Sequence, residues 1–249
     1  ISGHDARDDS SANRSFNFQV GPSDLRGKKL GVHRSEFGLS QSEHTGRVFQ
    51  EALDAFANMG VILEDISFPL RPTGALFTTI VTAESGTIFR PLFDDGRAAG
   101  MFTFNADRAA GWMAGRMMPV ADYLTAQRIR NQLKREADEI VSRYDAVIAP
   151  TWPNGAALRE VSQGWPIPAR NEWEPPDELS AQTPRLNYIA NLVGHPGLAI
   201  PCGFDEDGLP LSLQIVGSAF DEQAVLDFGM GFQRETDWHL RRPQYPWRE

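Results

Sequence analysis

The alternation of apolar and polar residues predicts strands and helices in alternating order along much of the chain. An apolar strand is expected at 29–33 and a second at 61–68, separated by a helix at about 43–59 whose apolar residues recur at helical spacing. Gly60 supplies the left-handed residue that ends this helix. Strand, helix and strand in this order predict two parallel strands joined by a right-handed crossover. The pattern therefore indicates an α/β fold.

A long helix should follow Pro119 and end near Tyr144, because its apolar residues are spaced for burial on one side and charged residues lie between them. The residues expected to be buried are Val120, Tyr123, Leu124, Leu133, Ala137, Ile140 and Val141. Before this helix, residues 75–118 read as helical pieces interrupted by glycines and rich in Met and Phe, which favours adaptable packing against another element.

The apolar run at 145–150 predicts a fully buried strand, and its carboxyl end leads into a loop that extends to about residue 182. Two further strands flank Asp205 to Gly208 and should form a hairpin, since the second of them alternates Leu and Ile with Ser and Gln. A last helix is expected from about Asp221, its N-cap, to Glu235. The glycines of the 229–231 segment lie inside this helix and indicate close packing.

Two parts of the chain differ in composition. Residues 1–24 are rich in Asp, Ser and Asn and predict a polar linker or arm on the surface. Residues 25–249 contain the expected strands and helices, and the length of the chain and its 41% apolar content allow them to form one α/β domain.

Composition excludes several functions. A net charge of −9 and a pI near 5.1 argue against general binding to nucleic acid or anionic membranes. No apolar run reaches the ~18 residues that span a bilayer, so we expect a cytoplasmic protein. Cys202 is the one cysteine, which rules out an internal disulfide.

The chain shows no catalytic or cofactor motif of its own. It contains neither a G-x-S-x-G elbow nor a G-x-G-x-x-G loop, and its five histidines have no metal-ligand spacing. Cys202 reads as a small buried residue, because nothing near it in sequence would activate a thiol. We therefore assign no catalytic residue, no metal and no cofactor from these residues.

The segment 191–222 carries a resemblance to a known family. It contains N-x-x-G-x-P-x-x-x-x-P-x-G-F, then D-G-L-P-x-x-x-Q-x-x-G, then F-D-E. In this it resembles the C-terminal part of the amidase signature hydrolases. ISGHDARDDSS at 1–11, LRGKKLGV at 25–32, YLTAQRIR at 123–130, YDAVIAPTWP at 144–153 and QRETDWHLRRP at 233–243 are similar to further landmarks of that family, in the same order.

The resemblance implies an α/β fold, the C-terminal part of the amidase signature fold, with a mixed β-sheet flanked by helices that is incomplete without an N-terminal half. It also implies hydrolysis of carboxamide C–N bonds by two serines, one in a cis peptide, and a neutral lysine. Those motifs have no match here, so the chain is expected to be silent alone. Its implied partners are the N-terminal half or a separate Ser/Lys-bearing polypeptide, and a small amide substrate, with a homodimer left open.

The family's C-terminal half lines part of the substrate pocket. By position, Thr151, Trp152 and Pro153 after the buried strand are the first candidates, followed by Arg128 and Asn191. For Trp152 a sheet-covering role is equally expected, and for Arg128 a solvated or ion-paired role is favoured. His195 departs from the family pattern and could face a pocket, although a local role is favoured.

Three alternatives remain open. Within the family, the tRNA-dependent glutamine amidotransferase A subunit needs an acidic residue before Asn191, and residues 181–191 contain none, which favours a general amidase. A non-catalytic binding or assembly subunit derived from an amidase is the second. An unrelated hydrolase that uses Cys202 or His195 is the third.

Overall fold

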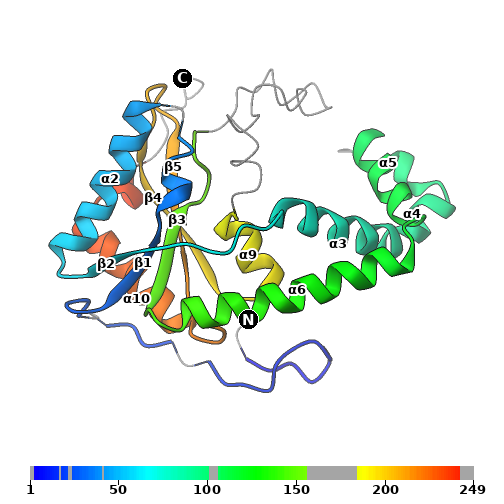
Figure 1. The fold of residues 1–249 in the computed structure, drawn as a ribbon, viewed down its shortest axis with the longest axis horizontal. Helices are drawn as coiled ribbons and strands as arrows, with labels where there is room; N and C mark the ends of the chain where they lie inside the picture. The colour runs from blue at the N-terminus through cyan, green and yellow to red at the C-terminus, as the bar shows by residue number, and fades with distance from the viewer. Residues whose placement is uncertain are drawn as a thin grey trace, which may run out of the picture.

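The computed structural model describes residues 3–16, 18–21, 24–40, 42–100, 106–155 and 184–241. They form a mixed five-stranded sheet with helices on both faces (Figure 1). The strand order is β2-β1-β3-β5-β4. The strands are β1 (Lys29–His33), β2 (Ile62–Ile66), β3 (Ala146–Pro150), β4 (Gly197–Phe204) and β5 (Pro210–Val216).

The helices come mostly between the strands in sequence. They are α1 (Arg34–Phe37), α2 (Glu43–Asn58), α3 (Thr73–Ile88), α4 (Arg90–Asp94), α5 (Ala106–Gly115), α6 (Val120–Val141), α9 (Leu186–Val193) and α10 (Glu222–Glu235). Two 3₁₀ turns, η1 (Arg97–Gly100) and η3 (Trp238–Leu240), complete the described elements.

The first unit is β1–α2–β2, as its pattern predicts. The Ser42 side chain accepts a hydrogen bond from the Thr45 N–H and so caps α2, and Gly60 takes the left-handed conformation with φ of 82° just beyond the helix. β1 pairs in parallel with β2 on one side and with β3 on the other. The three strands therefore end at the same edge of the sheet.

The predicted hairpin forms β4 and β5, which pair antiparallel, and β5 also pairs antiparallel with β3. Asp205 closes the turn: its N–H donates to the Leu209 carbonyl at 2.9 Å, and its carboxylate accepts from the N–H groups of Asp207 and Leu209. The sheet is thus mixed, parallel on the β2 side and antiparallel on the β4 side.

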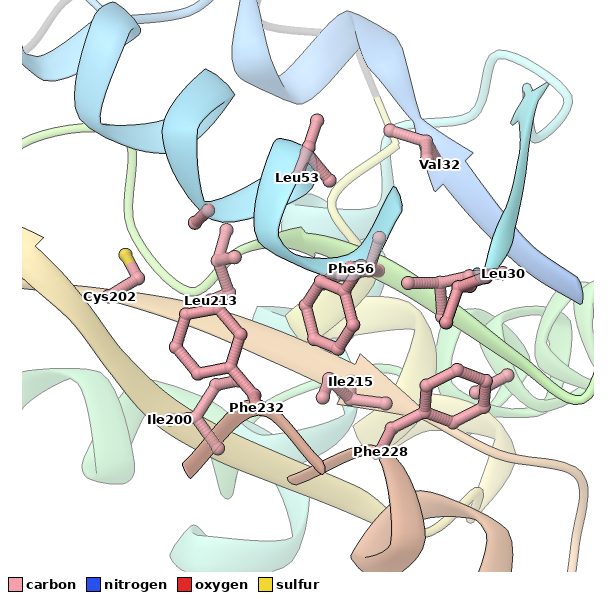
Figure 2. Packing of buried hydrophobic residues seen from close by; sticks show 14 of the residues in the cluster. Leu30, Val32, Leu53, Phe56, Ile200, Cys202, Leu213, Ile215, Phe228 and Phe232 are labelled. Carbon is pink, nitrogen blue, oxygen red and sulfur yellow. The ribbon is translucent and has the colours of Figure 1, made fainter. Parts of the chain in front are cut away.

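One face of the sheet is covered by α2 and α10, which enclose an aromatic core (Figure 2). Phe56 of α2 stacks on Phe232 of α10 with ring centroids 5.0 Å apart. A Cβ at Gly229 would lie 2.4 Å from Leu198 Cδ2, and one at Gly231 would lie 2.4 Å from Leu25 Cδ1. Close packing therefore accounts for both glycines of the 229–231 segment, as predicted.

The other face is covered by α3, α6 and α9 around a second, aliphatic core. Leu133, Ala137 and Val141 of α6 are almost completely buried there. Beyond the sheet, α3 and the first half of α6 continue outward with α4 and α5 as a helical arm (Figure 1).

The expectation that Val120 and Leu124 are buried is wrong, since they are 72% and 45% exposed. Both lie in the first two turns of α6, where Tyr123 and Ala126 pack against the second core while Val120 and Leu124 remain open to solvent. The helical pieces expected at 75–118 are confirmed as α3, α4 and α5 with η1, although Met101, Phe102 and Phe104 lie outside the described residues.

The described residues between 3 and 21 form turns without a helix or strand, and they are mostly exposed. Gln19 N–H donates to the Gln223 side chain at 3.0 Å, and Gln223 Nε2 donates back to the Gln19 carbonyl at 3.2 Å. Leu25 then enters the aromatic core. The N-terminal segment therefore rests against the start of α10.

The predicted α/β class with a mixed sheet flanked by helices is confirmed. Among the described residues, no helix is both long enough and apolar enough to cross a bilayer.

Candidate functional site

The parallel strands place their last residues, His33, Ile66 and Pro150, along one edge of the sheet, which we call the carboxyl edge. Segments that follow parallel strands meet at such an edge, where open α/β sheets bind ligands. Here α1 follows β1 and residues 151–155 follow β3. This edge is therefore the first place to look for a site.

The three leading candidates from the sequence lie together there. The Thr151 N–H donates to the Ser212 carbonyl at 2.9 Å, which anchors the chain as it leaves β3. The Thr151 hydroxyl is buried and finds no hydrogen-bond partner among the described residues. Pro153 is buried, while Trp152 is 39% exposed. An exposed indole beside a hydroxyl can contribute an apolar wall and a polar contact to a pocket.

A buried charged cluster stands beside these residues. Glu36 and Arg185 have side chains only 2% and 7% exposed, and Glu36 Oε2 lies 3.5 Å from Arg185 Nε. Glu36 Oε1 also accepts a hydrogen bond from the Leu186 N–H at the start of α9. His33 Nε2 donates to the Pro184 carbonyl at 2.7 Å and lies 3.8 Å from Glu36 Oε1.

Burial governs the electrostatics of this cluster. It raises the pKa of Glu36 to about 7, against the lowering effects of the Leu186 N–H and the Arg185 charge. Burial also lowers the pKa of His33, which favours the neutral ring that donates to Pro184. The cluster therefore contains an acid that titrates close to neutral pH.

Sequence reasoning missed all three members of this cluster. Glu36 and Arg185 are about 150 residues apart in the chain, and nothing in the local patterns RSEF or TPRL distinguishes them from surface residues. The one available signal was position, because Glu36 follows a parallel strand and Arg185 precedes the segment that contains Asn191.

The remaining candidates lie elsewhere. Arg128 is exposed on α6, and Asn191 is exposed on α9 with its Nδ2 donating to the Asn187 carbonyl at 2.7 Å. A neighbour that was not predicted, Arg130, donates from Nε to the Leu192 carbonyl at 2.6 Å and so caps the end of α9. Thus α6 and α9 are joined through Arg130.

His195 lies at the opposite edge of the sheet, where the parallel strands begin. It precedes β4, whose first residue Gly197 pairs with Val216, and Val216 pairs with Val147 near the start of β3. The His195 side chain is 1% exposed, and its Nε2 lies 2.7 Å from Asp138 Oδ1 on α6. The structure therefore separates His195 from Thr151, Trp152 and Pro153.

The surface of the described residues includes the following two hollows. One of about 260 Å³ lies beside the hairpin turn, between Ser42, Thr45, Asn154 and residues 205–207. The other, of about 460 Å³, lies on the helical arm between α3 and the start of α6, with Glu84, Arg116 and Tyr123 among its lining residues. The first adjoins the end of the segment 151–155, so the carboxyl edge is hollowed on that side.

Metal and thiol chemistry find little support here. Within the described ranges, no group of three or more His, Cys, Asp or Glu side chains could hold a metal ion. Cys202 is packed in the aromatic core, and burial raises the pKa of its thiol to about 12. Its thiolate is therefore negligible at neutral pH.

Comparison with known proteins identifies the family of this chain. The Amidase family model matches residues 1–226, and the chain belongs to this family, that of the amidase signature enzymes. Curated relatives include proteins named as the A subunit of glutamyl-tRNA(Gln) amidotransferase. That of Acaryochloris marina is 30% identical over 244 residues, covering 89% of this chain and 48% of the relative. That of Oceanobacillus iheyensis is 29% identical over 269 residues, covering 98% of this chain and 52% of the relative.

Solved structures agree on the fold. A bacterial aryl acylamidase of the amidase signature family superposes with a TM-score of 0.75 at 20% identity, over 98% of this chain and 52% of that one. A native peptide amidase from Stenotrophomonas maltophilia superposes with a TM-score of 0.66 at 20% identity, over 98% of this chain and 51% of that one. The chain thus spans about half the length of each of these four proteins.

Proposed function

We propose that this chain is the C-terminal half of an amidase that hydrolyses carboxamide C–N bonds, with the two serines and the lysine of the reaction supplied by an N-terminal half or a separate polypeptide. Membership of the amidase family supports the reaction class. The candidate wall of Thr151, Trp152 and Pro153 at the carboxyl edge supports a part in the substrate pocket.

The surroundings of the lysine side chains are the observation that carries the proposal. The chain has three, and each forms an ion pair: Lys28 with Asp145 at 2.8 Å, Lys29 with Glu64 at 2.8 Å and Lys134 with Asp138 at 3.3 Å. Their side chains are 44–50% exposed. Hydrogen bonds to Asp145 and Glu64 raise the pKa of Lys28 and of Lys29.

A lysine that acts as a general base needs the opposite environment. It must be neutral near pH 7, which requires burial or a neighbouring cation to lower its pKa. The raised pKa values of Lys28 and Lys29 instead favour the protonated amine. The ion pairs of the three lysines therefore support a base that is supplied from outside this chain.

The test compares the chain alone with the chain mixed with a polypeptide that carries the serine and lysine half of an amidase. We expect no turnover of a panel of small carboxamides by the chain alone, and turnover on mixing. A serine-reactive phosphonate should then label only the added polypeptide. Labelling of this chain, or turnover without the added half, would contradict the proposal.

A triple variant, Lys28→Arg, Lys29→Arg and Lys134→Arg, provides the matched control. It keeps all three ion pairs but removes every lysine amine that could act as a base. The reconstituted activity should remain within about twofold of wild type. Loss of activity in a variant that still folds would place the base in this chain.

The glutamine amidotransferase A-subunit branch is a second candidate, because curated relatives carry that name. The absence of Asp and Glu from 181–191 favours a general amidase instead, although residues 181–183 lie outside the described ranges. The reconstituted enzyme distinguishes the two: release of ammonia from free glutamine in preference to simple carboxamides would favour the A-subunit branch. Stable association without any turnover would favour a non-catalytic assembly subunit.

A further inference from the structure

The buried pair of Glu36 and Arg185 joins segments that are distant in sequence. Glu36 belongs to α1, directly after β1, and through its two carboxylate oxygens it contacts both the Arg185 guanidinium and the Leu186 N–H. The backbone N–H of Arg185 donates to the Thr73 hydroxyl at the start of α3, with a distance of 3.4 Å between the nitrogen and the oxygen. The ends of β1 and the starts of α3 and α9 are therefore fixed to one another at this point.

Arg185 extends these connections to the candidate pocket wall. Its Cζ lies 4.5 Å from the centroid of the Trp152 ring, which is cation–π geometry. The guanidinium thus contacts a buried carboxylate and a partly exposed indole. A planar guanidinium held by a carboxylate has a defined orientation, so it can set the orientation of an indole stacked on it.

His33 also contacts the segment that contains Arg185. Its Nε2 donates to the carbonyl of Pro184, the residue before Arg185, and its ring meets the Phe68 ring edge-on at 5.2 Å. The backbone on both sides of Arg185 is therefore held, by His33 through Pro184 and by Glu36 through Leu186.

Stability alone explains this arrangement poorly. A buried ion pair must repay the loss of hydration of both charges, and apolar residues of similar volume often serve a core as well or better. The pair instead fixes the orientation of its neighbours, because Arg185 contacts the Trp152 ring and Glu36 contacts the start of α9.

We propose that Glu36 and Arg185 are positioning residues that hold Trp152, and with it residues 151–155, in one orientation at the carboxyl edge. Neither residue touches the substrate: Glu36 acts through Arg185, and Arg185 acts through the indole. The role in catalysis rests on the amidase function proposed above, whereas the positioning of Trp152 does not.

The first measurement is the fluorescence of Trp152 in the 249-residue chain. Because the chain has six tryptophans, the Trp152 signal is obtained by subtracting the signal of the same protein carrying Trp152→Phe. Glu36→Gln keeps an oxygen that can accept from Leu186 but removes the charge that faces Arg185. Arg185→Lys keeps a positive charge but removes the plane that stacks on the indole.

At pH 8, above the pKa of Glu36, we expect acrylamide to quench the Trp152 signal about twofold more strongly in Glu36→Gln and in Arg185→Lys than in wild type, since the indole loses its fixed partner. Glu64→Gln is the matched control: it makes the same chemical change in the exposed pair with Lys29, and it should leave the signal unchanged. Equal quenching in wild type, Glu36→Gln and Arg185→Lys would overturn the proposal.

A pH titration tests the same point with the native side chains of Glu36 and Arg185 in place. Glu36 is faced by His33 of β1 and by Arg185, which has Tyr188 nearby, while β3, packed against α1, has no ionisable side chain. The Trp152 signal should change with a midpoint near the pKa of Glu36, about 7, and the change should disappear in Glu36→Gln. Because that variant keeps His33, a titration that persists in it would assign the effect to His33 and overturn the proposal.

Kinetics of the reconstituted amidase give the functional readout. Glu36→Gln should raise KM several-fold with little change in kcat, as expected for a wall that binds ground state and transition state alike. If mixing never yields turnover, the proposed function fails while the fluorescence result still decides whether Trp152 is positioned. An unchanged KM together with an altered Trp152 signal would remove the catalytic role and overturn the proposal in that part.

Discussion

The two edges of the sheet each place a histidine near a carboxyl group, but they bury these groups differently. At the carboxyl edge, the side chains of His33 and Glu36 are 1% and 2% exposed, and Arg185 lies against the same carboxylate. At the opposite edge, His195 is 1% exposed, whereas Asp138 is 45% exposed. The histidines are alike in burial, and the acids are not.

The pKa shifts of the two acids run in opposite directions for this reason. At Asp138 burial raises the pKa, but the hydrogen bond with His195 and the charge of Lys134 outweigh it and the net shift is downward. At Glu36 burial dominates and the net shift is upward. Of these two acids, the one whose ionised form is disfavoured by burial is therefore the one beside the candidate pocket wall.

The largest effect should come from breaking the buried pair. Glu36→Ala leaves the Arg185 charge in the interior without its carboxylate and frees the Leu186 N–H, which should lower the free energy of unfolding by about 3–5 kcal/mol at pH 7. Urea denaturation of the chain measures this value.

The matched substitution is Glu64→Ala, which removes the carboxylate of an exposed pair with Lys29. It should cost about 0–0.5 kcal/mol, as is usual for surface ion pairs. Similar losses for the two variants would show that the carboxyl edge is not electrostatically distinct from the surface.

The pH dependence of stability should reveal the same contrast, with a slightly smaller effect. Because the folded pKa of Glu36 lies above its ordinary value of 4.5, the protonated form is favoured in the folded state. This contribution is fully present below pH 4.5 and is lost as the pH rises through about 7. It amounts to about 3 kcal/mol.

Comparison with Glu36→Gln isolates this contribution, since the remaining acids titrate in both proteins. Between pH 4.5 and 8, wild type should lose about 3 kcal/mol relative to Glu36→Gln. Parallel stability curves across that range would mean that Glu36 is ionised in the folded state at an ordinary pKa.

Much of the fold could be predicted from the sequence because its signals are local. The crossover of β1, α2 and β2 follows from helical spacing and the stop at Gly60, and the hairpin follows from alternation about Asp205 to Gly208. Helical spacing also gave the wrong prediction that Val120 is buried. Periodicity identifies the apolar face of a helix, but it does not show whether another element covers that face.

The site could be predicted only in part. The position after β3 identified Thr151 to Pro153 as residues at the carboxyl edge, and the structure places them there. The contacts of Glu36 with Arg185 and of Asp138 with His195 join residues far apart in sequence, and such pairings depend on the packing of whole elements. No local pattern encodes them.

The smallest of the three effects should appear at the opposite edge. Asp138→Ala removes the partner of His195 Nε2, but its carboxylate is nearly half exposed and water can replace it, so the cost should be about 1 kcal/mol at pH 7. Because the pKa of Asp138 is lowered, its contribution is present above the ordinary value of 3.8 and lost as the pH falls through the folded pKa. Urea denaturation of wild type and Asp138→Ala at pH 7 measures this difference. A loss as large as that expected for Glu36→Ala would mean that the two edges depend equally on their carboxylates, although Glu36 is buried and Asp138 is 45% exposed.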